Sequence, residues 1–142
     1  MIYLLLILSL KAASLDGPEL NERSRHEGTW AVTSMVRDGK EAPADVRDSI
    51  RRVVKDDHVT WTRDGKTFAG TKVEYDPSKE PHTLDLIPDG GPHRDKRILA
   101  IYWLEGDALT ICVADPDGPR PTAFDAPAGS KRTLQTFKRI GA

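Results

Sequence analysis

Hydrophobic and polar residues alternate along most of this chain, in short runs that are separated by turn residues. The first clear run, residues 29–36, is rich in β-branched and aromatic side chains and ends before the turn pair Asp38-Gly39. Further runs follow at the spacing of about 8 to 12 residues that is typical of β-sandwiches and β-barrels. The pattern predicts strands over residues 29–36, 50–55, 58–62, 67–75, 82–87, 97–104, 108–113 and 133–139.

Short turns join almost all of these expected strands, and no long helix separates them. Parallel pairing needs crossover connections of roughly a dozen or more residues, so antiparallel pairing is expected. The sequence therefore predicts an all-β fold, an eight-stranded antiparallel up-and-down barrel of the lipocalin-like kind, whose closure removes exposed strand edges. An immunoglobulin-like sandwich is the alternative. Residues 42–49 are expected to form a loop with one helical turn, and residues 115–131 a long loop before the last strand.

The chain begins with an apolar run, residues 1–10, followed by Lys11 and the small residues Ala12, Ala13 and Ser14. This run is too short to span a bilayer, and small residues stand where a signal peptidase would cut. We therefore expect residues 1–14 to be a signal peptide and residues 15–142 to be an exported domain, periplasmic or extracellular. Because no Lys or Arg precedes the run, the alternative is the first strand or buried start of a cytosolic domain.

A short helix is expected between this apolar run and the first strand. Asp16-Gly17-Pro18-Glu19 places a proline and acidic residues at an early helical position, where they suit the positive end of the helix dipole. The helix is expected to run to about Glu27, because Gly28 then ends it.

Composition narrows the classes of function. The chain has 142 residues, of which 38% are hydrophobic and 30% charged, enough for one domain with an apolar core. Its net charge is -1 and its basic and acidic residues are interleaved, which argues against the basic face that nucleic-acid binding requires. The single cysteine, Cys112, cannot by itself form an internal disulfide or a thiolate metal site. We predict no nucleic-acid partner, no cofactor, no metal site and no stable membrane span.

Two groups of residues resemble known families. Gly28-Thr29-Trp30 is similar to the Gly-x-Trp signature of lipocalins, and Lys138-Arg139 stands where those barrels place a basic residue against the tryptophan. More widely, residues 27–139 resemble an uncharacterised domain family that is abundant in planctomycete bacteria. The residues that carry this resemblance are Gly28-Thr29-Trp30, Asp38-Gly39-Lys40, Asp76-Pro77-Ser78-Lys79, Asp85-Leu86, Gly91-Pro92, Ile101-Tyr102, Gly106-Asp107, Leu109, Cys112, Arg120-Pro121-Thr122, Phe124, Gly129-Ser130 and Lys138-Arg139.

The resemblance implies a small exported or membrane-attached domain with a lipocalin-like fold and no established activity, so it transfers no catalytic residue. It also implies that Gly28, Trp30 and Arg139 are structural, with the Arg139 guanidinium stacked on or bonded near the indole. The chain departs from the family at His93-Arg94-Asp95, in a loop usually richer in Gly and Lys, and at Trp103, where a polar residue is common.

No residue pattern predicts catalysis. The four histidines are scattered and are expected to be solvated on the surface, since even Asp57, which stands beside His58, would point to the opposite face of a strand. Asp115-Pro116-Asp117-Gly118 resembles a fragment of a calcium loop but lacks the downstream glutamate, so a plain turn is expected. Cys112 alternates with apolar residues and is interpreted as a packing residue. The protein is therefore predicted not to be an enzyme, with no catalytic residue.

The remaining hypothesis is binding or contact. Alternation places Trp61, Tyr102 and Ile111 on the inner side of the barrel, where an apolar ligand would lie. Arg120, in the longest loop, is a further candidate for the mouth of the barrel, although pairing with a carboxylate to tether the loop is the favoured alternative. We predict a non-enzymatic exported binding or interaction module whose partner is a small apolar ligand or a protein. The alternative is an accessory protein-contact domain with a filled barrel.

Overall fold

The computed structural model describes residues 21–142, which form strands, short helices and connecting loops. Residues 21–26 are helical and lead directly into the first strand. The start of the expected N-terminal helix and the expected signal peptide lie outside the described residues. The remaining elements are β1 (Gly28–Arg37), β2 (Lys40–Glu41), α2 (Ala44–Ser49), β3 (Ile50–Lys55), β4 (His58–Arg63), β5 (Lys66–Asp76), β6 (His82–Pro88), β7 (Ile98–Glu105), β8 (Ala108–Val113) and β9 (Thr133–Gly141).

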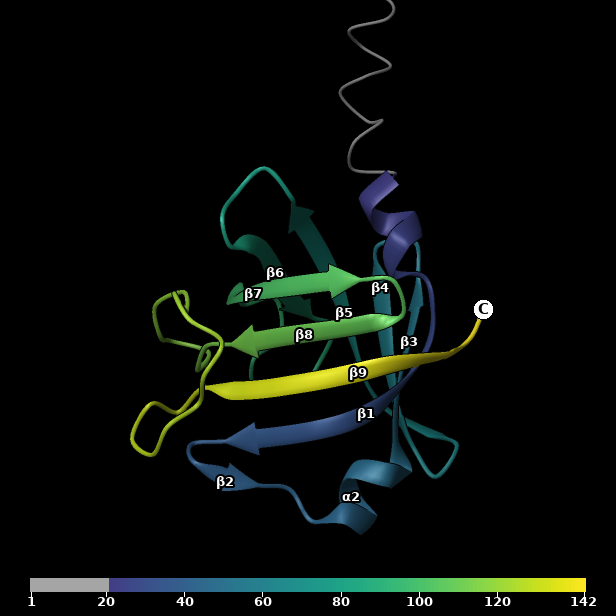
Figure 1. Cartoon of the computed structure of the whole chain (residues 1–142), viewed down its shortest axis with the longest axis horizontal. Coiled ribbons are helices and arrows are strands. Elements are labelled where there is room, and N and C mark those ends of the chain that lie inside the picture. The colour runs from purple at the N-terminus through teal and green to yellow at the C-terminus, as the bar shows by residue number, and fades with distance from the viewer. Residues whose placement is uncertain (1–20) are drawn as a thin grey trace, which may run out of the picture.

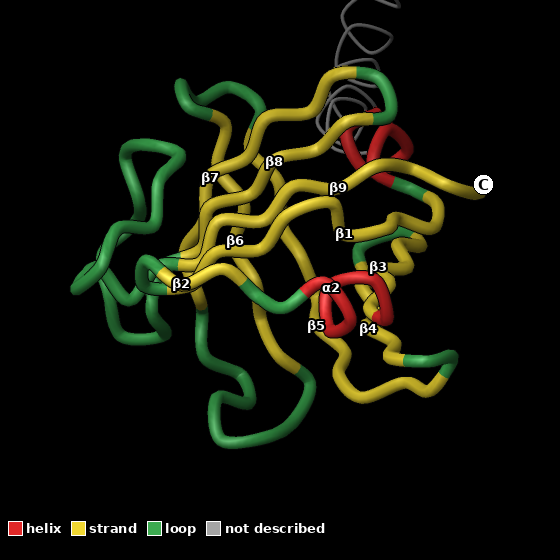
Figure 2. The backbone as a smooth tube through the Cα atoms, turned by 60° about the horizontal axis from the view of Figure 1, so that its bottom comes forward, coloured by secondary structure: helices red, strands yellow, loops and turns green. Residues whose placement is uncertain are grey.

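The long strands form one closed antiparallel barrel. Each of β3 to β9 pairs with its neighbour in sequence, β1 pairs with β3, and β1 also pairs with β9 from the other side, which closes the cylinder (Figure 2). The eight-stranded up-and-down barrel predicted from the sequence is confirmed. Its expected strands match the observed ones closely, and β2 is a two-residue addition at the end of β1 that the pattern did not reveal.

Alternation of buried and exposed side chains shows why these segments form strands around a core. In β3, for example, Ile50, Arg52 and Val54 are buried and face inward, whereas their neighbours are more exposed. The apolar core is formed by inward side chains of every long strand, and its largest members include Trp30, Tyr102 and Phe137. Trp61 packs against this core from β4. The inward face predicted from alternation is therefore correct.

Successive connections lie alternately at the two ends of the barrel, because each strand is antiparallel to the one before it. The helical residues 21–26 lie at the end where β1 begins, together with the turns that follow β3, β5 and β7 (Figure 1). We call this the helix end. The segment that holds α2, the β4–β5 turn and the loops after β6 and β8 lie at the opposite end, which we call the loop end. The α2 segment is the one helical turn expected within residues 42–49.

The long loop between β8 and β9 folds back onto the outer face of the barrel. Ile101 and Cys112, which pair across β7 and β8 and face outward, are both buried, and Ala126 of the loop is buried as well. The Cys112 thiol donates to the Asp125 carbonyl at 3.3 Å, and burial raises the pKa of this thiol. Cys112 is therefore a packing residue beneath the loop, as predicted.

Candidate functional site

The helix end is closed by a contact that the sequence predicts. The Arg139 guanidinium lies 4.3 Å from the centroid of the Trp30 ring, and it also donates to the Glu27 carbonyl and to the Asp107 carboxylate. The Trp30 indole donates to the His26 carbonyl at 2.9 Å. Gly28 permits this closure, because its φ is +128° and an added Cβ would lie 2.6 Å from the Gly141 carbonyl oxygen. These contacts fasten the helical residues to the barrel.

Two side chains of the helical segment are buried against the barrel interior. Glu22 is 3% exposed and His26 is fully buried, although the sequence predicted that all histidines are solvated. That prediction is wrong for His26, because the helical residues pack over the barrel end and direct one face of a single turn inward. The His26 ring stacks on Tyr75 with a centroid distance of 4.0 Å. The Glu22 carboxylate accepts hydrogen bonds from the Tyr102 hydroxyl and from Arg25.

Burial and charge set the protonation of this cluster. Burial raises the pKa of Glu22, but the His26 and Tyr102 side chains and the Arg25 charge outweigh it and lower the pKa to about 2. Burial lowers the pKa of His26 to about 4, against the opposing effect of Glu22. The pKa of Tyr102 is raised by burial and by the neighbouring carboxylate. At neutral pH, Glu22 is therefore charged and His26 is neutral.

Arg52 lies further along the interior and is 1% exposed. Its guanidinium lies over the Phe137 ring at 5.6 Å, but neither terminal nitrogen has a hydrogen-bond partner in the described part of the chain. The Tyr75 hydroxyl is also buried, with no hydrogen-bond partner of normal geometry among residues 21–142. Burial lowers the pKa of the Arg52 guanidinium, and the interaction with Tyr75 opposes this effect. A full positive charge and a phenol are thus held inside the barrel with unused hydrogen-bonding capacity.

The loop end has an apolar depression, which we call the mouth. It has a volume of about 320 Å³ and is lined by Met35, Ile50, Trp61, Phe68, Ala69 and Gln135. Trp61 is partly buried, and its ring lies 6.0 Å from Phe137 in the core. Phe68 is 58% exposed and extends the apolar lining of the mouth to the surface. The mouth therefore joins exposed apolar surface to the barrel interior.

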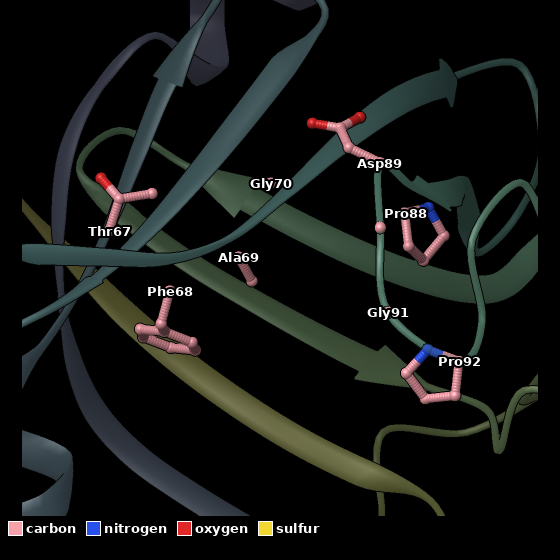
Figure 3. Close-up of a pocket in the computed structure, with 9 residues that line it drawn as sticks. Thr67, Phe68, Ala69, Gly70, Pro88, Asp89, Gly91 and Pro92 are labelled. Atoms are coloured by element: carbon pink, nitrogen blue, oxygen red, sulfur yellow. The ribbon is translucent and has the colours of Figure 1, made fainter.

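A second hollow adjoins the mouth where β5 extends past β6. β6 pairs with β5 only from Thr71 to Asp76, so the beginning of β5 faces the loop that follows β6. The hollow has a volume of about 600 Å³, and Figure 3 shows Phe68 and Pro92 on opposite sides of it. Phe68 and Ala69 line both depressions. The surface around Phe68 is thus indented on two sides.

The four ligand-binding residues predicted from the sequence lie in three different places. Trp61 lines the mouth. Tyr102 and Ile111 are buried deep in the core at 0% and 2% exposure, and the Tyr102 hydroxyl is occupied by Glu22. Arg120 donates to Asp85 at 2.7 Å and to the Ala100 carbonyl at 2.8 Å. It therefore tethers the β8–β9 loop to β6 and β7, which was the favoured alternative, and is not at the mouth.

Sequence reasoning missed the buried polar residues, which are Glu22, His26, Arg52 and Tyr75. Two signals were present. Glu22 and His26 are four residues apart, the spacing that places two side chains on one helical face. Arg52 occupies an inward position between Ile50 and Val54, where an apolar residue is expected.

Comparisons of the chain with protein-family models, with curated proteins and with solved structures gave no match. Within residues 21–142, no group of three or more His, Cys, Asp or Glu side chains is arranged to hold a metal ion. No helix in the same part of the chain is long and apolar enough to cross a membrane.

Proposed function

We propose that the protein is a small-molecule binding module that takes the apolar part of its ligand at the mouth. The observation that carries this proposal is the 320 Å³ depression lined by Trp61, Phe68 and other apolar side chains at the loop end of the barrel. Small-molecule sites are concave, mostly apolar and commonly located in the mouths of β-barrels, and this volume is at the lower end of their range of about 300 to 1,000 Å³.

We also propose that the module works outside the cytoplasm and needs no catalytic residue. The apolar run of residues 1–10 and the small residues that follow it support export. The resemblance to the planctomycete domain family supports the same location.

Binding of a neutral fluorescent probe, N-phenyl-1-naphthylamine, tests the mouth. We expect saturable binding of one probe per protein, and a loss of tenfold or more in affinity for Trp61→Ala, because the ring would provide a wall of the site. Trp103→Ala is the matched control, since Trp103 is 51% exposed and lies on the outer face against His82. Absence of saturable binding, or an equal loss in both variants, would contradict the proposal.

A protein-contact domain with a filled barrel is the second candidate function. The deep burial of Tyr102 and Ile111, which occupy the interior with their own side chains, favours it. It takes the place of the first if the wild-type protein binds neither N-phenyl-1-naphthylamine nor any member of a broad panel of lipids and aromatic compounds.

A further inference from the structure

Arg52 places a positive charge in the barrel interior that forms no ion pair with any carboxylate of the described residues. Arg52 is fully buried, and none of the ion pairs formed by residues 21–142 includes it. Buried arginines are almost always paired, because removing a charge from water is costly unless hydrogen bonds replace the lost hydration. Contact with the Phe137 ring provides only the weaker cation–π attraction. An anion bound to the guanidinium would therefore provide the hydrogen bonds and the negative charge that the described residues do not.

None of the neighbouring titratable side chains neutralises the charge of Arg52. Glu22 is the buried carboxylate of the same interior, but it is occupied by Tyr102 and Arg25. His26, stacked on Tyr75, is neutral at neutral pH and brings no negative charge. Tyr75 interacts with the Arg52 guanidinium and raises its pKa against the effect of burial, but neither group has a hydrogen-bond partner of normal geometry among the described residues. Two guanidinium nitrogens and one phenol are thus available donors.

Arg52 is also close to the mouth. Its guanidinium lies over the Phe137 ring at 5.6 Å, and the Trp61 ring lies 6.0 Å from the same Phe137. Arg52 and Trp61 are directly opposite one another on β3 and β4, so their side chains share the inner face. The charge is therefore one aromatic side chain away from the residue that lines the depression.

From these observations we infer that the ligand is an apolar molecule with a single carboxylate, which Arg52 and Tyr75 bind inside the barrel. The inference rests on the proposed function. The planar guanidinium matches a carboxylate with two parallel N–H···O bonds, and the Tyr75 hydroxyl provides a third donor. One positive charge neutralises one negative charge, which favours a monoanion. The apolar body of the ligand extends past Phe137 to the mouth, which Trp61 lines.

The test compares decanoate with 1-decanol, two probes with the same alkyl chain and different head groups. Binding is measured by calorimetry and by tryptophan emission at pH 7.5. We expect wild-type protein to bind decanoate at least tenfold more tightly than decanol. Arg52→Met should remove this preference by weakening decanoate binding tenfold or more with decanol unchanged. Tyr75→Phe should weaken decanoate binding several-fold. Arg52→Lys should retain part of the preference for decanoate, since the positive charge remains but the planar, two-pronged guanidinium is lost.

Each outcome supports or overturns the inference. N-phenyl-1-naphthylamine binding by Arg52→Met shows that the variant is folded with an intact mouth. Equal binding of decanoate and decanol by the wild type overturns the carboxylate site but leaves the proposed function in place. A preference for decanoate that survives in Arg52→Met overturns it too, because the selectivity then comes from another group. If neither decanoate nor decanol binds, and the neutral probe does not bind either, the proposed function fails together with the inference.

Discussion

Replacing Arg52 by methionine is expected to make the empty protein more stable. In the wild type, two guanidinium nitrogens are buried without partners, and an unsatisfied buried polar group costs about 1 to 3 kcal/mol, more when it is charged. The substitution forfeits the contact with Phe137, which is worth about 0.5 to 2 kcal/mol. Methionine keeps much of the apolar stem and adapts to irregular gaps. The net gain is expected to be about 1 to 4 kcal/mol, the balance between removing two unsatisfied buried nitrogens and losing the contact with Phe137.

Urea unfolding followed by tryptophan emission measures this gain. With a slope of about 2 kcal/mol per M for a domain of this size, the midpoint should rise by about 0.5 to 2 M without a change of slope. Arg63→Met is the control, because Arg63 is exposed at the end of β4 and its replacement should change stability by less than about 0.5 kcal/mol. A loss of stability for Arg52→Met at unchanged slope would refute the reasoning, since it would mean that the guanidinium stabilises the folded barrel.

Three further outcomes are expected. Trp30→Ala should lower the free energy of unfolding by about 3 to 5 kcal/mol in the same urea experiment, because the ring is fully buried under Arg139; an unchanged midpoint would contradict the closing role of this contact. The free energy of unfolding should fall by about 3 kcal/mol as the pH decreases from 6.5 to about 4. In this range His26 becomes protonated in the unfolded chain, where its pKa is 6.5, but stays neutral in the folded protein, where its pKa is about 4. His26→Phe should flatten this part of the curve, and an identical slope in both proteins would exclude His26 as its source. Finally, mass spectrometry of protein from its native host should find residues 1–14 removed, whereas an intact Met1 in cytosolic material would contradict export.

The strands could be predicted because their signals are local. Turn pairs such as Asp38-Gly39 and Asp64-Gly65 have positive φ at both residues, and they separate runs whose alternation identifies the inner face. Alternation does not give depth along the barrel. Trp61 and Tyr102 share the inner face, yet one reaches the mouth and the other is sealed in the core. For that reason, residues predicted to form one binding site lie at different depths of the barrel.

The buried polar cluster could not be predicted, because it depends on tertiary contacts. The spacing of Glu22 and His26 shows that they share one helical face, but nothing in the six helical residues reveals that this face docks over a barrel end. For Arg52, alternation indicates an inward side chain, but a missing counter-charge becomes visible only when all neighbours are placed. The tether role of Arg120 was anticipated because long loops in compact domains need fixing, although its carboxylate partner, Asp85, was unknown.

The seam between β1 and β9 has a kinetic consequence. It joins segments about as far apart in the chain as the domain allows, as in the contact between the Thr33 and Thr136 hydroxyls, which are 103 positions apart and 2.7 Å from one another. Contacts of such long range form slowly, because the whole intervening chain must first be brought together. Until β9 arrives, β1 and β8 each present an open edge that can pair with another chain. The domain therefore stays vulnerable to aggregation until its last strand has emerged, so its safe production depends on keeping the incomplete chain apart from its own copies.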